Sequence, residues 1–142
     1  MDCLLDKGQF ILKSVAIQEI HHRIKNNLQT ISSLLRLQFR RMKDRNAKKA
    51  LEESISRIVS VSITHELLSE SGIVDVDIKI LIERIADNGK DYLLEPNKNI
   101  DIKVLGNTFV VDSQYATSIA LIANELIQNS IDDGFKTKIM DI

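Results

Sequence analysis

The chain has 142 residues, of which 44% are hydrophobic and 27% are charged, and its formal net charge is −1. This length suits one domain, or one small domain with part of another, and the near-neutral charge gives no field that would favour nucleic acid or an anionic membrane. The single cysteine, Cys3, excludes an internal disulfide and a cysteine-based metal site.

The first predicted element is a long helix over residues 10–42, a stretch without Pro or Gly. KDRN at 43–46 is a short polar break, and a second helix runs from there until Gly72 offers a stop. In both helices apolar residues recur at steps of three, four and seven, the spacing of one helical face. In the first helix these residues are Ile17, Ile20, Ile24, Leu28, Ile31, Leu35 and Met42.

Two long helices joined by a short turn predict an antiparallel hairpin. Such a hairpin exposes an apolar seam along both helices, and the usual remedy is to pair with a second hairpin in a four-helix bundle. We therefore expect a homodimer.

The second half has an α+β pattern. It opens with a short extended segment and a helix that closes near Pro96, the only proline. Residues 99–111 alternate apolar and polar side chains around the turn residues LGNT and predict a β-hairpin. A last helix begins at an N-cap, either Asp112 or Ser113, and runs to Gly134.

Two adjacent histidines, His21 and His22, lie in the first helix. At about 100° per residue, His22 falls roughly 150° from the apolar stripe, on a polar face that also carries Asn26 one turn later. His21 falls only about 50° from the stripe, where a partly buried, hydrogen-bonded structural role is expected. His65 lies within the apolar stripe of the second helix and is expected to be a hydrogen-bonded histidine of the bundle core.

His22 has two interpretations from the residues alone. It is either an ordinary polar surface residue or a nucleophile and phosphate carrier, because an unperturbed imidazole is largely neutral at cellular pH. In the second case the Asn26 amide could orient the ring or contact a transferring group.

The stretch NELIQN, residues 124–129, forms a second constellation. Glu125 and Asn129 are four residues apart on one helix face, with Asn124 beside them. The amide oxygen could bind a hard cation such as Mg²⁺, and the carboxylate could act as a base or orient water; a solvated polar face is the alternative. The glycines of this region form neither a Walker nor a Rossmann phosphate loop.

Two segments together resemble a known family. EIHHRIKNNLQTISSLLRLQFRR closely resembles the dimerisation and phosphoacceptor domain of bacterial sensor histidine kinases of the HWE-related type, with its HRxKN core, NLQ and leucine-rich helix. LIANELIQNSIDDGF resembles the N box of the ATP-binding domain in the same kinases and in the GHKL superfamily, which includes gyrase and mismatch-repair ATPases. The resemblance spans residues 10–135, in matching order.

The resemblance implies a mainly α fold with a small α+β part. Residues 1–72 would be a hairpin for dimerisation and histidine phosphotransfer. Residues 73–142 would be the N-terminal part of a GHKL-type ATPase α/β sandwich that stops after the N box.

The resemblance also implies roles for particular residues. His22 would take the γ-phosphoryl group of ATP and pass it to an aspartate of a response-regulator receiver domain, with Asn26 helping to position the ring. Asn129 would coordinate Mg²⁺ and Glu125 would be the acidic residue of the N box, which Asn124 begins. Asn124, Glu125 and Asn129 are thus the candidate cofactor-binding residues.

The chain departs from the family pattern in two places. The commoner kinases place an acidic base directly after the phosphoacceptor, whereas this chain has Arg23. Glu19 could accept the proton instead, although a plain i,i+4 ion pair with Arg23, worth a few tenths of a kcal/mol, is slightly favoured. Asp132 and Asp133 stand where Lys or His is usual and would oppose a triphosphate unless Mg²⁺ or the fold directs them elsewhere.

The glycine-rich DxGxG and GxG segments that follow the N box in this superfamily are not in this sequence. We therefore expect ATP and Mg²⁺ to act in a complete parent kinase and this chain alone to bind neither. The alternatives are a dimeric histidine phosphotransfer module that never uses ATP, and a purely structural helical dimer.

The chain is expected to be cytoplasmic. It has no apolar run approaching ~20 residues and no signal-peptide pattern at its start. The expected partners are a second copy and a receiver domain, with no direct nucleic-acid binding and no membrane contact.

Overall fold

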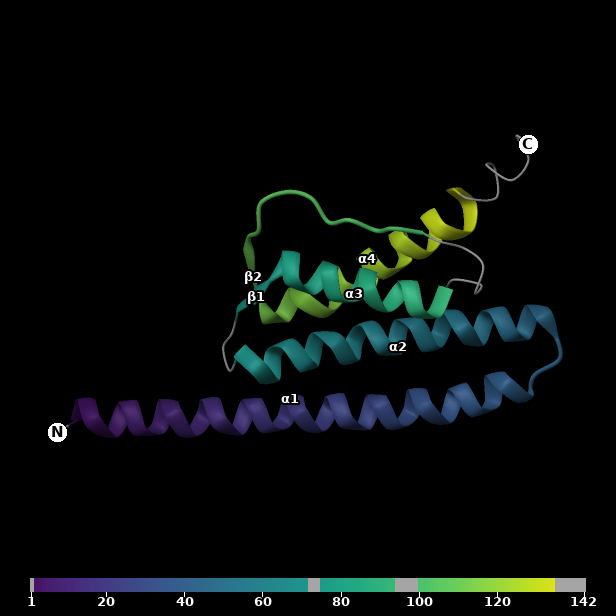
Figure 1. The fold of residues 1–142 in the computed structure, drawn as a ribbon. Coiled ribbons are helices and arrows are strands. Elements are labelled where there is room, and N and C mark those ends of the chain that lie inside the picture. Colours follow the sequence, from purple (N-terminus) through teal and green to yellow (C-terminus); the bar gives the residue numbers. More distant parts are fainter. Residues whose placement is uncertain (1, 72–74, 94–99, 135–142) are drawn as a thin grey trace.

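In the computed structural model, the described residues, 2–71, 75–93 and 100–134, form helices in three layers and two short strands. Figure 1 shows α1 in one outer layer, α2 in the middle, and α3 and α4 on the other side of α2. No helix within these residues has the length and apolar character needed to cross a membrane. The elements are α1 (Asp2–Arg41), α2 (Arg45–Ser71), β1 (Asp75–Asp77), α3 (Ile78–Leu93), β2 (Val110–Asp112) and α4 (Ser113–Gly134).

The predicted antiparallel hairpin is confirmed, with α1 and α2 packed along one another (Figure 1). Residues 42–44 form the connection, and the Asp44 carboxylate caps α2 by accepting the backbone N–H of Asn46 at 2.9 Å. α1 starts well before residue 10, where the sequence placed its beginning. The predicted helix stop at Gly72 lies outside the described residues.

The two helices of the second half, α3 and α4, both begin after an aspartate that acts as N-cap. Asp77 ends the short strand β1, and its carboxylate accepts a backbone N–H in the first turn of α3 at 3.1 Å. Asp112, one of the two predicted N-caps, does the same for α4 at 3.0 Å. The extended segment and both helices are therefore where the sequence placed them, while Pro96 lies outside the described residues.

The predicted β-hairpin over residues 99–111 is wrong in its pairing. Residues 100–109 form no strand, and β2 pairs antiparallel with β1 instead. The chain does turn at Gly106, whose φ of 122° suits glycine. Leu105 and Phe109 are exposed, and a two-stranded hairpin with an uncovered apolar face is at best marginal. Of the expected α/β sandwich, the described residues contain only this two-stranded ladder and the helices α3 and α4.

α2 is buried on two sides, and the sequence predicted only the side that faces α1. The other side meets α4, and the Ser56 and Asn124 side chains bond across this contact. The contact is built from small or polar residues four apart on each helix, a spacing that allows close helix packing, and each is at most 7% exposed. They are Ser56, Ser60 and Thr64 on α2, and Ala116, Ala120, Asn124 and Gln128 on α4.

The close α2–α4 contact predicts that a larger side chain at Ala120, which is fully buried, will force the two helices apart. Ala120→Leu should lower the free energy of unfolding by about 1–3 kcal/mol, measured by urea denaturation. Ser118→Leu adds the same side chain at an exposed position of α4 and should change it by less than about 0.5 kcal/mol. Equal effects of the two substitutions would contradict this packing.

Candidate functional site

His22 and Asn26 are both exposed on α1, as the helical wheel predicted. α1 is one uninterrupted helix on both sides of them, so their relative placement is fixed by helix geometry at one turn apart. The structure thus presents an imidazole and an amide to solvent on one rigid surface. This is the arrangement that a docking partner needs in order to reach a ring nitrogen.

His21 faces α2 and is engaged there. Its Nδ1 lies 2.9 Å from Nδ1 of His65, and the ring centroids are 5.1 Å apart. Burial lowers the pKa of His21, and burial together with the nearby His21 ring lowers the pKa of His65. At least one of the two rings must be neutral to accept the hydrogen bond. The prediction of a partly buried, hydrogen-bonded His21 is confirmed. The hydrogen bond predicted for His65 is confirmed too, although this side chain is half-buried and not in the core.

Glu19 forms the ion pair that the sequence favoured. Its Oε1 lies 3.0 Å from Nε of Arg23, and both side chains are more than half exposed. An exposed i,i+4 pair of this kind adds little to stability. Glu19 is therefore engaged with Arg23 rather than with His22.

The N-box residues face three different surroundings. Asn124 is 3% exposed, and its Oδ1 accepts the Ser56 hydroxyl at 3.0 Å. Glu125 accepts a hydrogen bond from Arg57 at 2.5 Å, which holds the pKa of this carboxyl below its usual value. Asn129 is exposed one turn later. The sequence gave no signal for Ser56 or Arg57 as partners, because both belong to a distant helix.

These three residues do not converge on one ligand. Among the described residues, no group of three or more His, Cys, Asp or Glu could hold a metal ion. Asp132 lies 4.0 Å from Lys49 of α2, so the fold directs this charge toward the hairpin. Asn124 and Glu125 are thus both engaged with α2, and of the three residues only Asn129 is exposed.

The two candidate regions are also separated from one another. α1 packs on α2, and α4 packs on the other side of α2 (Figure 1). His22 stands on α1 and the N box on α4, so the described part of one chain does not bring them together.

Comparison with known proteins decides the family. A family model described as a histidine kinase, HisKA_2, matches residues 19–92, just over half of the chain. The chain belongs to the histidine kinase family. The match begins at Glu19, just before the two histidines, and covers the rest of α1, then α2, β1 and most of α3.

Two mycobacterial proteins are similar to this histidine kinase over most of its length. The sensor histidine kinase PdtaS of Mycolicibacterium smegmatis is 40% identical over 126 residues, which are 89% of this chain and 25% of that protein. The sensor histidine kinase PdtaS of Mycobacterium tuberculosis is 40% identical over 125 residues, 88% of this chain and 25% of that protein. No solved structure matches. The chain thus spans about a quarter of the length of these curated relatives.

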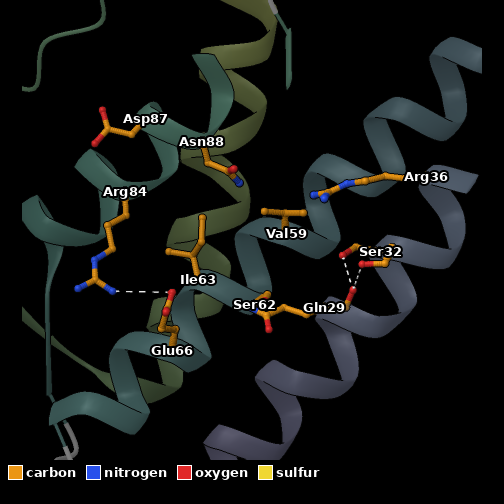
Figure 2. Close-up of a pocket in the computed structure, with 11 residues that line it drawn as sticks. Gln29, Ser32, Arg36, Val59, Ser62, Ile63, Glu66, Arg84, Asp87 and Asn88 are labelled. Carbon is orange, nitrogen blue, oxygen red and sulfur yellow. Dashed lines mark hydrogen bonds and ion pairs between the residues drawn. The ribbon is translucent and has the colours of Figure 1, made fainter. Parts of the chain in front are cut away.

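A groove of about 590 Å³ lies on the His22 side of the histidine kinase, between α1, α2 and α3 (Figure 2). Gln29, which lines it, is seven residues beyond His22 and so lies on the same helix face. Arg84 of α3 lies 2.9 Å from Glu70 and 3.9 Å from Glu66, and these ion pairs hold α3 against α2. Nothing in the sequence indicated this groove, because its walls come together only in the tertiary structure.

The His21–His65 contact predicts an acid-sensitive hairpin. Because both folded-state pKa values are lowered, the unfolded chain takes up protons near pH 6.5 before the folded chain does. The free energy of unfolding should therefore decrease as the pH is lowered through about 6.5, measured by urea denaturation at each pH.

A matched pair of variants locates this effect. His22→Gln should keep the pH dependence because His22 is exposed, and the double variant His21→Leu, His65→Leu should lose most of it. If the double variant responded to pH as the wild type does, other groups would be responsible.

Proposed function

We propose that this histidine kinase chain receives a phosphoryl group on His22 and passes it to an aspartate of a response-regulator receiver domain. In autophosphorylation a ring nitrogen of His22 attacks the γ-phosphorus of ATP, the bond to the bridging oxygen breaks, ADP leaves and the ring gives up its N–H proton. The second transfer moves the phosphoryl group from the ring nitrogen to a carboxylate oxygen. In this proposal ATP and Mg²⁺ are bound by the ATP-binding domain of a complete kinase of this family.

The observation that carries this proposal is the contrast between the two neighbouring histidines. His21 is held by His65, whereas His22 is exposed on the surface of a rigid helix. A phosphate carrier has to be reached by both its donor and its acceptor, and only the exposed ring meets this need. The names of the curated relatives, sensor histidine kinase PdtaS, agree with this role.

The supporting residues have proposed roles as well. Asn26, one turn from His22, positions the ring or contacts the transferring group. Glu19 is the nearest carboxylate before His22 in the sequence. It could take the proton from His22 once its ion pair with Arg23 has broken. Asn129 is the proposed Mg²⁺ ligand, and Glu125 is the proposed acidic residue of the nucleotide site.

A homodimer belongs to this proposal. Large apolar side chains remain exposed along α1, and a second hairpin packed as a four-helix bundle would cover them. They include Leu12, Val15, Ile17, Ile20, Ile31, Leu34 and Leu37.

A second candidate is a dimeric histidine phosphotransfer module without ATP use. It is favoured by one observation, that Asn124 and Glu125 are both bonded to α2. In this case His22 would receive its phosphoryl group from a phosphorylated receiver only.

The proposed function predicts acid-labile phosphate on His22. The chain should become labelled when it is mixed with ATP and a complete kinase of the same family, measured with radioactive ATP and peptide mass spectrometry. Label only from a phosphorylated receiver would favour the phosphotransfer module.

His22→Gln should reduce the label to background, and His21→Gln should keep it, since His21 is turned toward α2. Label that survives His22→Gln and disappears in His21→Gln would move the site. No label from any donor would leave only the structural dimer.

A further inference from the structure

The contact between His21 and His65 brings together two metal-binding side chains from different helices. His21 belongs to α1 and His65 to α2, 44 positions later, and their Nδ1 atoms lie 2.9 Å apart. Imidazole nitrogens are the commonest metal ligands in proteins, and they suit Zn²⁺, Cu²⁺, Fe²⁺ and Ni²⁺. Two ligand atoms therefore face each other across the hairpin.

The separation of these two nitrogens fits adjacent positions around one metal ion. With metal–nitrogen bonds of about 2.0–2.1 Å, a distance of 2.9 Å between the nitrogens corresponds to an angle of about 90° at the metal. This is the angle between neighbouring ligands in the tetragonal complexes that Ni²⁺ and Cu²⁺ form with nitrogen and oxygen. A tetrahedral Zn²⁺ ion needs about 3.3 Å between its ligands, so the two rings would move apart by about 0.4 Å.

The protonation of the pair also suits a metal ion, because a ligating imidazole has to be neutral. Burial lowers the pKa of both rings, which keeps them neutral at physiological pH. In the hydrogen bond one Nδ1 donates and the other accepts. On metal binding the donor ring would carry its proton on Nε2 instead of Nδ1, and the rings would rotate to turn both lone pairs onto the ion, with no net loss of protons.

The rest of the coordination would come from water. Within the described part of the chain, no third His, Cys, Asp or Glu joins the pair to complete a metal-binding group. Both histidines are only half-buried, so an ion can enter and water can reach it. A site with two protein ligands binds more weakly than a closed structural site with four, and its ion exchanges with the surroundings.

We propose that His21 and His65 form a two-histidine site for a divalent transition-metal ion, which fastens α1 to α2 one residue away from His22. Because the ligands come from two helices, the complete site exists only in the folded hairpin. The site does not depend on the proposed phosphoryl transfer, since neither ligand is the proposed phosphate carrier.

Metal binding should stabilise the whole chain against urea. NiCl₂ or ZnCl₂, in a buffer that does not chelate metals, should raise the midpoint of urea denaturation, and the rise should grow with the logarithm of the metal concentration. MgCl₂ at the same concentrations should leave the midpoint unchanged, because Mg²⁺ prefers oxygen ligands. A midpoint that none of the three salts moves would overturn the site.

Single substitutions locate the ion. His21→Gln and His65→Gln each remove one ligand and keep a polar side chain. Each should weaken Ni²⁺ binding at least about tenfold in isothermal titration calorimetry, since losing even a hydrogen-bond partner of a ligand costs about 10–100-fold. His22→Gln is the matched control, because it removes the neighbouring exposed imidazole, and it should bind Ni²⁺ as the wild type does.

The wild-type chain provides a test that does not depend on how the variants fold. In nitrogen-15 NMR spectra of the imidazole rings, Zn²⁺ should shift the Nδ1 resonances of His21 and His65 and leave those of His22 in place. Shifts at His22 alone, or equal Ni²⁺ affinity in His21→Gln and the wild type, would overturn the site. No phosphoryl transfer enters these measurements, so the metal site and the proposed function can fail separately.

Discussion

The middle helix, α2, packs against different helices on two of its sides. On one side it meets α1 in the hairpin, where His21 and His65 share a hydrogen bond. On the other side a row of small hydroxyl residues allows α4 to approach closely. The hydroxyls of Ser60 and Thr64 donate to carbonyls of their own helix one turn earlier, so they are buried without demanding partners from α4. Everything else in the fold is arranged around this doubly covered helix.

The consequence for function is a division of labour between neighbouring residues. In the first helix, His21 packs against α2, and the exposed His22 is the residue for which we propose the chemistry. In α4, Asn124 and Glu125 form hydrogen bonds to α2, and Asn129 is exposed. Adjacent positions on a helix point about 100° apart, so a single turn can serve structure and function together. The family assignment and the exposure of His22 independently support the proposal that His22 carries the phosphoryl group.

The sequence could predict what depends on apolar periodicity. The hairpin follows from the apolar stripes of its two helices, and the different exposure of His21 and His22 follows from the angle of each side chain to the stripe. The second buried face of α2 could not be predicted, because residues such as Ser60 carry no hydrophobic signal. The hairpin at 99–111 was mispredicted because alternation identifies the faces of an extended segment but not its pairing partner. Arg57 had no local signature, since an ion pair between distant helices depends on how they pack.

The unequal lengths of the two hairpin helices have a mechanical meaning. α1 has 40 residues and α2 has 27, which at about 1.5 Å per residue leaves roughly 20 Å of α1 without cover from α2. Figure 1 shows this overhang at the amino end. Because α1 continues unbroken from the overhang past His22, a rotation of the overhang about the helix axis would turn the His22 side chain through the same angle, as long as the helix stays rigid.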